Sequence, residues 1–281
     1  MNTVELRGVR KTYDHFVAVD GLSFSIEQGA VFGLLGPNGA GKTSTIRMMI
    51  GISVPDSGEV FTFGETFRRA HLDRIGYLPE ERGLYRKMKV LDQLVFLAQL
   101  HGMSAHDARR RAADWCRRLE IADWMLKKVE ELSKGMQQKI QFIAALMHDP
   151  DFIIMDEPFF GLDPVNSALL KDVLLEQKAR GKTILFSTHR MDQVEKLCDR
   201  ICLIDHGRAV LQGDLREIKR RWGRSNVQIA YEGDGRFLEE AAPPDAGLQQ
   251  LRKLRRNPPA AGRRSAATAA PGGGPGARQP L

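Results

Sequence analysis

A glycine-rich loop ending in lysine and threonine lies between an apolar run at 31–35 and a helical pattern that begins at about 42. Glycines let backbone N–H groups turn inward around phosphate oxygens, and the N-terminus of the following helix faces the same negative charge. Lysine at this spacing reaches the β- and γ-phosphates of a nucleotide, and the next hydroxyl ligates Mg²⁺. The expected nucleotide-binding residues are Gly36, Pro37, Asn38, Gly39, Ala40, Gly41, Lys42, Thr43 and Ser44.

The alternative is that this sequence pattern occurs by chance, since the bare pattern arises in roughly one chain in a hundred of this length. The predicted strand before the loop and the predicted helix after it make a chance occurrence much less plausible than nucleotide binding.

Two adjacent acids, Asp156 and Glu157, follow the apolar run 152–155. A buried strand there delivers Asp156 to the carboxyl edge of a sheet, where the phosphate loop also opens. Asp156 is then placed to hold Mg²⁺, and Glu157 to polarise an attacking water as a general base. Taken alone, the pair fits a solvated loop equally well. Together with the phosphate loop it indicates hydrolysis of a nucleotide.

Short apolar or β-branched runs alternate with helical patterns along the body of the chain, which predicts an α/β fold with a mostly parallel sheet covered by helices on both faces. The expected strands are 3–9, 22–26, 31–35, 58–62, 75–79, 152–156, 183–187 and 200–205. The expected helices are 42–50, 90–101, 104–119, 134–148, 165–180 and 190–197.

Two features modify this alternation. The first three strands follow one another closely, with turns expected at Asp20-Gly21 and Gln28-Gly29, and therefore suggest an antiparallel element at the N-terminus. The block 90–130 is purely helical, and we interpret it as an inserted helical subdomain. Residues 1–213 are expected to form the nucleotide-binding domain.

The net charge of +7 is not spread over the chain. Residues 241–281 contain seven Lys or Arg and the single acid Asp245, so the body has almost no basic bias and the charge does not indicate nucleic-acid binding. We expect 214–240 to be a partial accessory region and 241–281 to be a disordered basic tail. Its composition fits either a natural tail or a gene translated out of frame after a frameshift near residue 240.

No apolar run approaches the roughly 20 residues of a membrane span, and the first residues carry no apolar leader. The chain is therefore expected to stay on the cytosolic side. Cys116, Cys198 and Cys202 form no C-x-x-C pair, which favours reduced, inert thiols.

A segment between the phosphate loop and the acid pair Asp156-Glu157 makes the chain resemble an ABC-type nucleotide-binding domain. It reads Leu132, Ser133, Lys134, Gly135, Met136, Gln137, similar to the L-S-G-G-Q signature of that family. In the family, the signature of one subunit caps the γ-phosphate held by another. A helix simply capped by Ser133 is the alternative for this segment alone.

Smaller matches extend the resemblance over residues 3 to about 213. Tyr13 stands where the family has an aromatic that stacks on adenine, and His189 where it has a switch histidine that contacts the γ-phosphate. Gly161, Leu162 and Asp163 match the D-loop, with Phe160 where serine is usual. The resemblance thus implies the catalytic residues Glu157, His189 and Lys42.

Residues 75–80 resemble the family's Q-loop strand, but Glu80 stands where glutamine is usual. Glu80 could still ligand Mg²⁺, with Thr43 and Asp156. Such an acidic Q-loop, together with Lys134 and Met136 in the signature, is typical of the branch that resembles sodium-export and drug-export ATPases.

The resemblance implies an ATP-hydrolysing motor subunit of an exporter, with ATP and Mg²⁺ as cofactors. The implied partners are a separate membrane permease and a second nucleotide-binding subunit, on the inner face of the cell membrane, without nucleic acid. Two alternatives are a soluble ABC ATPase acting on DNA or ribosomes, and a regulatory subunit that binds ATP without turnover. The transported substrate is not encoded in these motifs.

Overall fold

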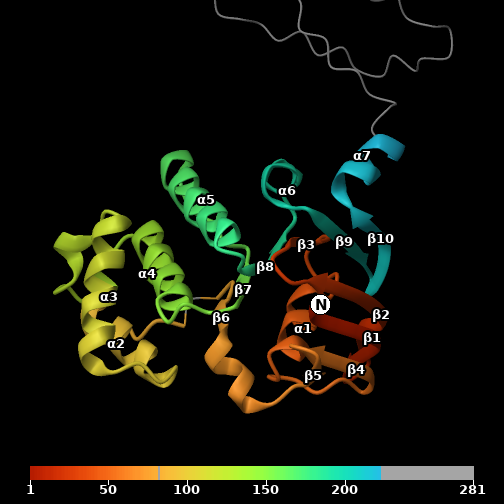
Figure 1. The fold of residues 1–281 in the computed structure, drawn as a ribbon, viewed down its shortest axis with the longest axis horizontal. Coiled ribbons are helices and arrows are strands. Elements are labelled where there is room, and N and C mark those ends of the chain that lie inside the picture. The colour runs from red at the N-terminus through yellow and green to blue at the C-terminus, as the bar shows by residue number, and fades with distance from the viewer. Residues whose placement is uncertain (82, 223–281) are drawn as a thin grey trace, which may run out of the picture. The chain divides into compact units, whose positions relative to one another are not determined.

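The computed structural model describes residues 1–81 and 83–222, in which two sheets are flanked by helices (Figure 1). The strands are β1 (Asn2–Tyr13), β2 (Phe16–Glu27), β3 (Val31–Leu35), β4 (Ser57–Thr62), β5 (Glu65–Thr66), β6 (Ile75–Leu78), β7 (Phe152–Asp156), β8 (Thr183–Thr188), β9 (Arg200–Asp205) and β10 (Arg208–Asp214). The α-helices are α1 (Lys42–Met49), α2 (Val90–Leu100), α3 (Ala105–Arg118), α4 (Lys134–Leu146), α5 (Pro164–Ala179), α6 (Met191–Leu197) and α7 (Leu215–Trp222). Short 3₁₀ turns are η1 (Arg69–Arg74), η2 (Ala122–Trp124) and η3 (Val129–Glu131).

The larger sheet has the order β10-β9-β3-β8-β7-β6 and is parallel except at β10. Every residue of β3, β7 and β8 is buried, as expected for central parallel strands covered on both faces. Apolar clusters fill both sides of this sheet. The predicted fold class is confirmed. The carboxyl ends of β3, β7 and β8 therefore meet at one edge.

The smaller sheet, β2-β1-β4-β5, is antiparallel, as predicted for the N-terminus. The expected turn at Asp20-Gly21 is wrong. The turn is at Asp14-His15, with Tyr13 opposite Phe16, and β2 continues through Asp20-Gly21. Gly21 has a φ of 70°, and the register shifts beside it, so the Asp-Gly pair marks an irregularity within the strand.

Helices α2, α3 and α4 gather beside the β6 edge of the larger sheet (Figure 1). Small buried residues of α3, Ala108, Ala112 and Cys116, allow close packing in this helical part. The ammonium of Lys139 on α4 is buried and donates to the Leu119 carbonyl at the end of α3, 2.9 Å away. This bond joins α4 to the predicted helical insertion.

The remaining predictions concern the sheet edges, the C-terminal part of the chain and the cysteines. β5 and β10 were not predicted, and the predicted accessory region 214–240 begins with α7. The rest of the predicted accessory region and the predicted tail lie outside the described residues. No helix within residues 1–81 and 83–222 has the length and apolarity needed to cross a bilayer. The three cysteines are free and buried, and burial raises the pKa of the Cys116 thiol to about 11.

Candidate active site

The phosphate loop connects β3 to α1 and packs closely against the backbones of β9 and β2. Gly36 has a φ of 152°, and a Cβ there would lie 2.2 Å from the Ile204 carbonyl oxygen. Gly41 has a φ of 104°, and its Cβ would lie 2.3 Å from the Ala18 carbonyl oxygen. These two positions therefore require glycine, because any side chain would push the loop away from β9 and β2.

Lys42 is the first residue of α1, and its side chain is buried in the loop itself. The ammonium donates to the carbonyl oxygens of Gly36 at 2.8 Å and Pro37 at 3.0 Å. Its charge is thus held against the loop, next to the N-terminus of α1. Both features favour bound phosphate.

Asp156 ends β7 and is 1% exposed. One carboxylate oxygen accepts from the Thr43 hydroxyl at 3.0 Å, and the other accepts from the Ser187 hydroxyl on β8. The hydroxyl and the carboxylate that the sequence predicted as metal ligands are therefore in direct contact. Oxygen ligands of this kind suit Mg²⁺, and the pair fits that ion.

Glu157 follows in the left-handed region with a φ of 49°, which is a strained conformation for glutamate. Its amide donates to the Ser187 carbonyl at 3.1 Å. The Thr188 hydroxyl donates to Oε2 at 3.1 Å, and the backbone N–H of His189 donates to Oε1 at 3.1 Å. The carboxylate is thus fixed by the end of β8, and the turn around it is stabilised by these bonds.

A cavity of about 360 Å³ opens over the loop. Its lining residues are Phe16, Ala18, Asn38, Gly39, Gly41, Lys42, Thr43, Ser44, Glu80 and Glu157. Glu80, from the loop after β6, therefore shares the cavity with the phosphate loop. Tyr13, the aromatic residue that the sequence predicted here, does not line the cavity. Phe16 lines it instead, and the sequence analysis did not predict this residue. Phe16 is paired opposite Tyr13, but this pairing follows only from the turn at Asp14-His15, which the sequence analysis placed elsewhere.

The signature segment lies elsewhere in the chain. Ser133 caps α4, with its hydroxyl accepting from the Met136 N–H at 3.3 Å, as the sequence predicted. A Cβ on Gly135 would lie 3.5 Å from Leu162 Cδ2, so the signature packs beside the D-loop residues 161–163. Asp163 in turn caps α5 by accepting from the Asn166 N–H. None of the signature residues is among those that line the 360 Å³ cavity.

Comparisons with known proteins agree on one family. A family model described as "ABC transporter" matches residues 19–160. The chain is 52% identical over 231 residues to the uncharacterized ABC transporter ATP-binding protein YhaQ of Bacillus subtilis (strain 168), covering 82% of this chain and 78% of that protein. It is 38% identical over 244 residues to Nod factor export ATP-binding protein I of Burkholderia pseudomallei (strain K96243), covering 85% and 80%.

Solved structures give the same picture. One described as the ATP binding subunit of an ABC transporter superposes with a TM-score of 0.73 at 30% identity, covering 79% of this chain and 93% of that one. A nucleotide-free ATP-binding cassette from an ABC transporter has a TM-score of 0.68 at 26% identity, covering 78% and 94%.

Proposed function

The chain belongs to the ABC transporter ATP-binding family, whose members bind and hydrolyse ATP, and from that membership we propose that it is the motor of an exporter whose membrane-spanning part is a separate permease. The observation that carries this proposal is the convergence of Lys42, Thr43, Asp156 and Glu157 at one sheet edge. Motifs far apart in the chain thus supply all the groups that phosphoryl transfer to water needs.

We assign each group a role from its setting. Lys42 and the loop amides bind the phosphates, and Thr43 and Asp156 hold Mg²⁺, which neutralises charge on the phosphate oxygens when bound. Glu80 faces the same cavity and supplies a further carboxylate oxygen toward that ion. Glu157 accepts the proton of the attacking water, because its carboxylate is fixed and opens onto the cavity. His189 positions this carboxylate.

The separation of the signature from the cavity supports a shared site. Ser133 and Gly135 lie beside the D-loop of their own chain and not on the phosphate loop. A helix N-terminus with a serine hydroxyl suits a γ-phosphate, so we assign these residues to the ATP held by a second nucleotide-binding subunit. ATP then closes the dimer, and hydrolysis opens it.

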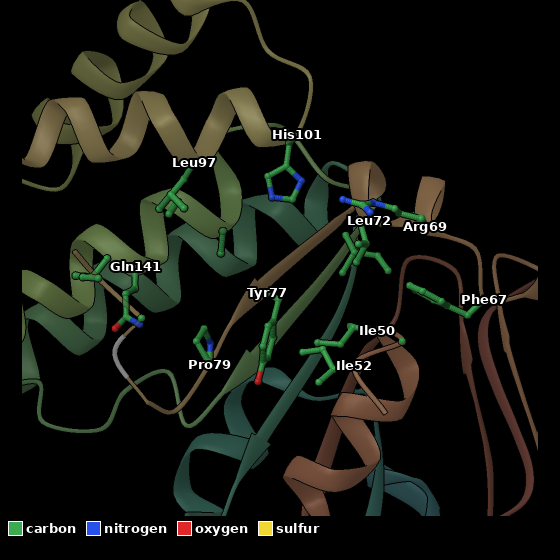
Figure 2. Close-up of a pocket in the computed structure, with 16 residues that line it drawn as sticks. Ile50, Ile52, Phe67, Arg69, Leu72, Tyr77, Pro79, Leu97, His101 and Gln141 are labelled. Carbon is green, nitrogen blue, oxygen red and sulfur yellow. The ribbon is translucent and has the colours of Figure 1, made fainter. Parts of the chain in front are cut away.

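We propose that a helix of the permease binds in a groove of about 660 Å³ (Figure 2). The groove lies between the end of α1 and η1 on one side and helices α2 and α4 on the other, with β6 as its floor. Apolar side chains form most of its lining, including Ile50, Ile52, Leu72 and Leu97, and Arg69 is the charged residue that lines it within the described part of the chain. This composition suits a short amphipathic helix with an acidic residue.

Two residues on the helical side of the groove have buried polar atoms without a hydrogen-bond partner among the described residues. These atoms are Oε1 of Gln141 and Nδ1 of His101. A buried polar atom without a partner is costly, so a shift of α2 and α4 that opened these atoms to donors of a docked helix would be favoured. Pro79 also lines the groove, one residue before Glu80 in the ATP cavity. Movement of this loop would therefore connect the two sites.

Export is the direction we favour, since relatives named for Nod factor export are similar over most of the chain. The acidic Glu80 in the Q-loop supports the same branch. Docking onto a permease places the chain on the inner face of the membrane.

The test is co-purification with the membrane protein encoded beside this chain, in detergent, with ATPase activity measured on the complex. Leu97→Asp should abolish co-purification while leaving ATP binding by the isolated chain unchanged. Leu100→Asp is the matched control, because Leu100 is on the same helix, is exposed and does not line the groove. Equal recovery of the permease with wild type and Leu97→Asp would refute docking in this groove, and a chain found only with ribosomes or DNA would refute the transporter role.

A further inference from the structure

Five cations gather where the segment 86–91 runs antiparallel beside the segment 125–131, at the start and the end of the helical insertion. Hydrogen bonds join the two segments, including one from the Val90 N–H to the Lys127 carbonyl at 3.0 Å. The five residues, which we call the cationic face, are all exposed: Arg86, Lys87, Lys89, Lys127 and Lys128. We propose that the cationic face lies on the surface of a bilayer and binds the headgroups of anionic lipids.

The pairing of the two segments places like charges together. Lys89 and Lys128 are directly opposite each other in an antiparallel bridge. Opposite residues of such a pair project from the same side, and like charges in this arrangement destabilise the fold. Within residues 1–81 and 83–222, neither ammonium forms an ion pair with a carboxylate. An anion from outside the chain that binds both lysines would remove the repulsion between them.

Acidic residues of the same segments do not cancel this charge. The two segments contain five cations and the two acids Glu130 and Glu131. Glu131 accepts from the backbone N–H of Lys128 at 2.8 Å, and its other carboxylate oxygen lies 3.9 Å from the Lys127 ammonium. The loops thus retain an excess of positive charge, which the negative potential of an anionic leaflet attracts.

Exposed apolar side chains are interleaved with the cations. Leu126 directly precedes Lys127 and is 71% exposed, and Tyr85 directly precedes Arg86 and is 54% exposed. Trp124 is also exposed. Cations bind lipid phosphates, whereas aromatic side chains and leucine enter the boundary between the headgroups and the acyl chains. The combination therefore suits a membrane surface, whereas an acidic protein segment would need the cations alone.

The shape of this part of the chain agrees with a fluid partner. No residue of the cationic face lines the ATP cavity or the permease groove. Its charges are thus spread over exposed loops outside these two enclosed sites. Lipid headgroups can rearrange around such charges, so the surface needs no fixed geometry to bind them.

Co-sedimentation of the purified full chain with lipid vesicles tests the proposal in the absence of a permease. Binding should be strong to phosphatidylcholine vesicles that contain about 30% phosphatidylglycerol and weak to phosphatidylcholine alone, and about 0.5 M salt should remove most of it. Lys89→Gln combined with Lys128→Gln should weaken binding about tenfold or more, since each cation near such a surface contributes about fivefold. This double variant should unfold at the same or a higher urea concentration than wild type, because a repulsive pair is lost.

Lys196→Gln combined with Arg216→Gln is the matched control. Both cations are exposed, on α6 and α7, and neither side chain forms an ion pair with a carboxylate of the described residues. The control lowers the net charge by the same amount, so it accounts for attraction by the charge of the chain as a whole. Its binding to anionic vesicles should stay within about twofold of wild type, because screening weakens charges that lie away from the surface.

Tryptophan fluorescence tests the apolar part of the contact. Anionic vesicles with brominated acyl chains should quench the fluorescence of the wild-type chain, and Trp124→Phe should remove most of this quenching. Undiminished quenching in Trp124→Phe would overturn the proposal. Because no permease is present, failure of vesicle binding leaves docking in the groove intact, and failure of co-purification leaves vesicle binding intact.

Two further results of the sedimentation experiment would also overturn the proposal. One is equal binding to neutral and anionic vesicles, and the other is an equal loss of binding in the two double variants. Tighter binding of the wild-type chain to polyglutamate than to anionic vesicles, lost in Lys89→Gln with Lys128→Gln, would instead assign the cationic face to an acidic protein segment.

Discussion

Nδ1 of His189 lies 2.7 Å from Oε1 of Glu157, and the backbone N–H of His189 donates to the same oxygen. One residue therefore holds the carboxylate through both its main chain and its ring. The His189 side chain is half exposed, whereas the glutamate is almost buried. In the mechanism we propose, this contact orients the carboxylate that receives the proton of water.

Glu157→Gln should remove most ATP turnover, by about 10²–10⁴-fold, because the amide cannot accept that proton. The hydrogen bonds to the amide oxygen can be kept, so ATP binding should stay within a few-fold of wild type. The measurement is single-turnover hydrolysis together with an ATP titration. Near wild-type hydrolysis by Glu157→Gln would show that another group is the base.

Glu80→Gln tests the departure from the family's usual residue. The change removes a carboxylate from a cavity that Glu157 also lines and in which we place the phosphates of ATP. We expect a higher Mg²⁺ concentration for half-maximal ATPase activity, because one anionic oxygen near the ion is lost, and tighter binding of metal-free ATP. Glu81→Gln is the control, since Glu81 is the adjacent exposed acid and does not line the cavity. Identical Mg²⁺ dependence in both variants would exclude Glu80 from the metal site.

The parts of the site that local patterns encode could be predicted from the sequence. The run Val31–Leu35, the glycines and α1 specify strand, loop and helix in consecutive residues, and the apolar strand before Asp156 fixes its place at the sheet edge. Phe16 could not be found in this way. Asp14-His15 is a weaker turn signal than Asp20-Gly21, yet the pairing of β1 with β2 places the turn at the former.

The groove also depends on tertiary structure. Its lining comes from α1, η1, β6, α2 and α4, and no local pattern shows that Ile52, Leu72 and Leu97 face one another. Strand β10 was missed for a related reason. It is an edge strand of mostly exposed residues, so it has little apolar alternation, and its pairing with β9 decides its structure.

Two histidines near the groove predict a dependence of stability on pH. His101 and His148 stack with their ring centres 3.8 Å apart. Burial lowers the pKa of His148 to about 4, with a further contribution from His101, while the Ile75 and Ala144 carbonyls and Asp149 act in the opposite direction. Burial also lowers the pKa of His101, against the Leu72 carbonyl and Asp73.

Because the unfolded histidine has a pKa of about 6.5, the unfolded state binds more protons between about pH 4 and 6.5. Stability that is fully present above pH 6.5 should therefore fall as the pH decreases toward 4, by about 1–3 kcal/mol for His148. Urea unfolding at several pH values measures this slope. His148→Gln, which keeps a donor for the Ile75 carbonyl, should show a shallower slope between pH 6.5 and 4, and an unchanged slope would contradict the assignment.

The last prediction concerns the site that we propose two subunits share. Ser133→Ala combined with Gly135→Asp should leave ATP binding by the single chain unchanged, because neither residue lines its own cavity. Aspartate at position 135 adds negative charge where we place the γ-phosphate of the partner's ATP, so ATP-dependent dimers should be lost. Leu162 is the nearest neighbour of that side chain, at ordinary contact distance, and the fold should tolerate it.

Mixing this double variant with Lys42→Ala chains decides between a shared site and a fold defect. Lys42→Ala alone should bind ATP weakly and should not dimerise, since its own phosphate loop has lost the ammonium. A mixed dimer has one composite site in which both the loop and the signature are intact. ATP-dependent mixed dimers in gel filtration, formed when neither variant dimerises alone, would establish the sharing, and a double variant that dimerises normally by itself would exclude it.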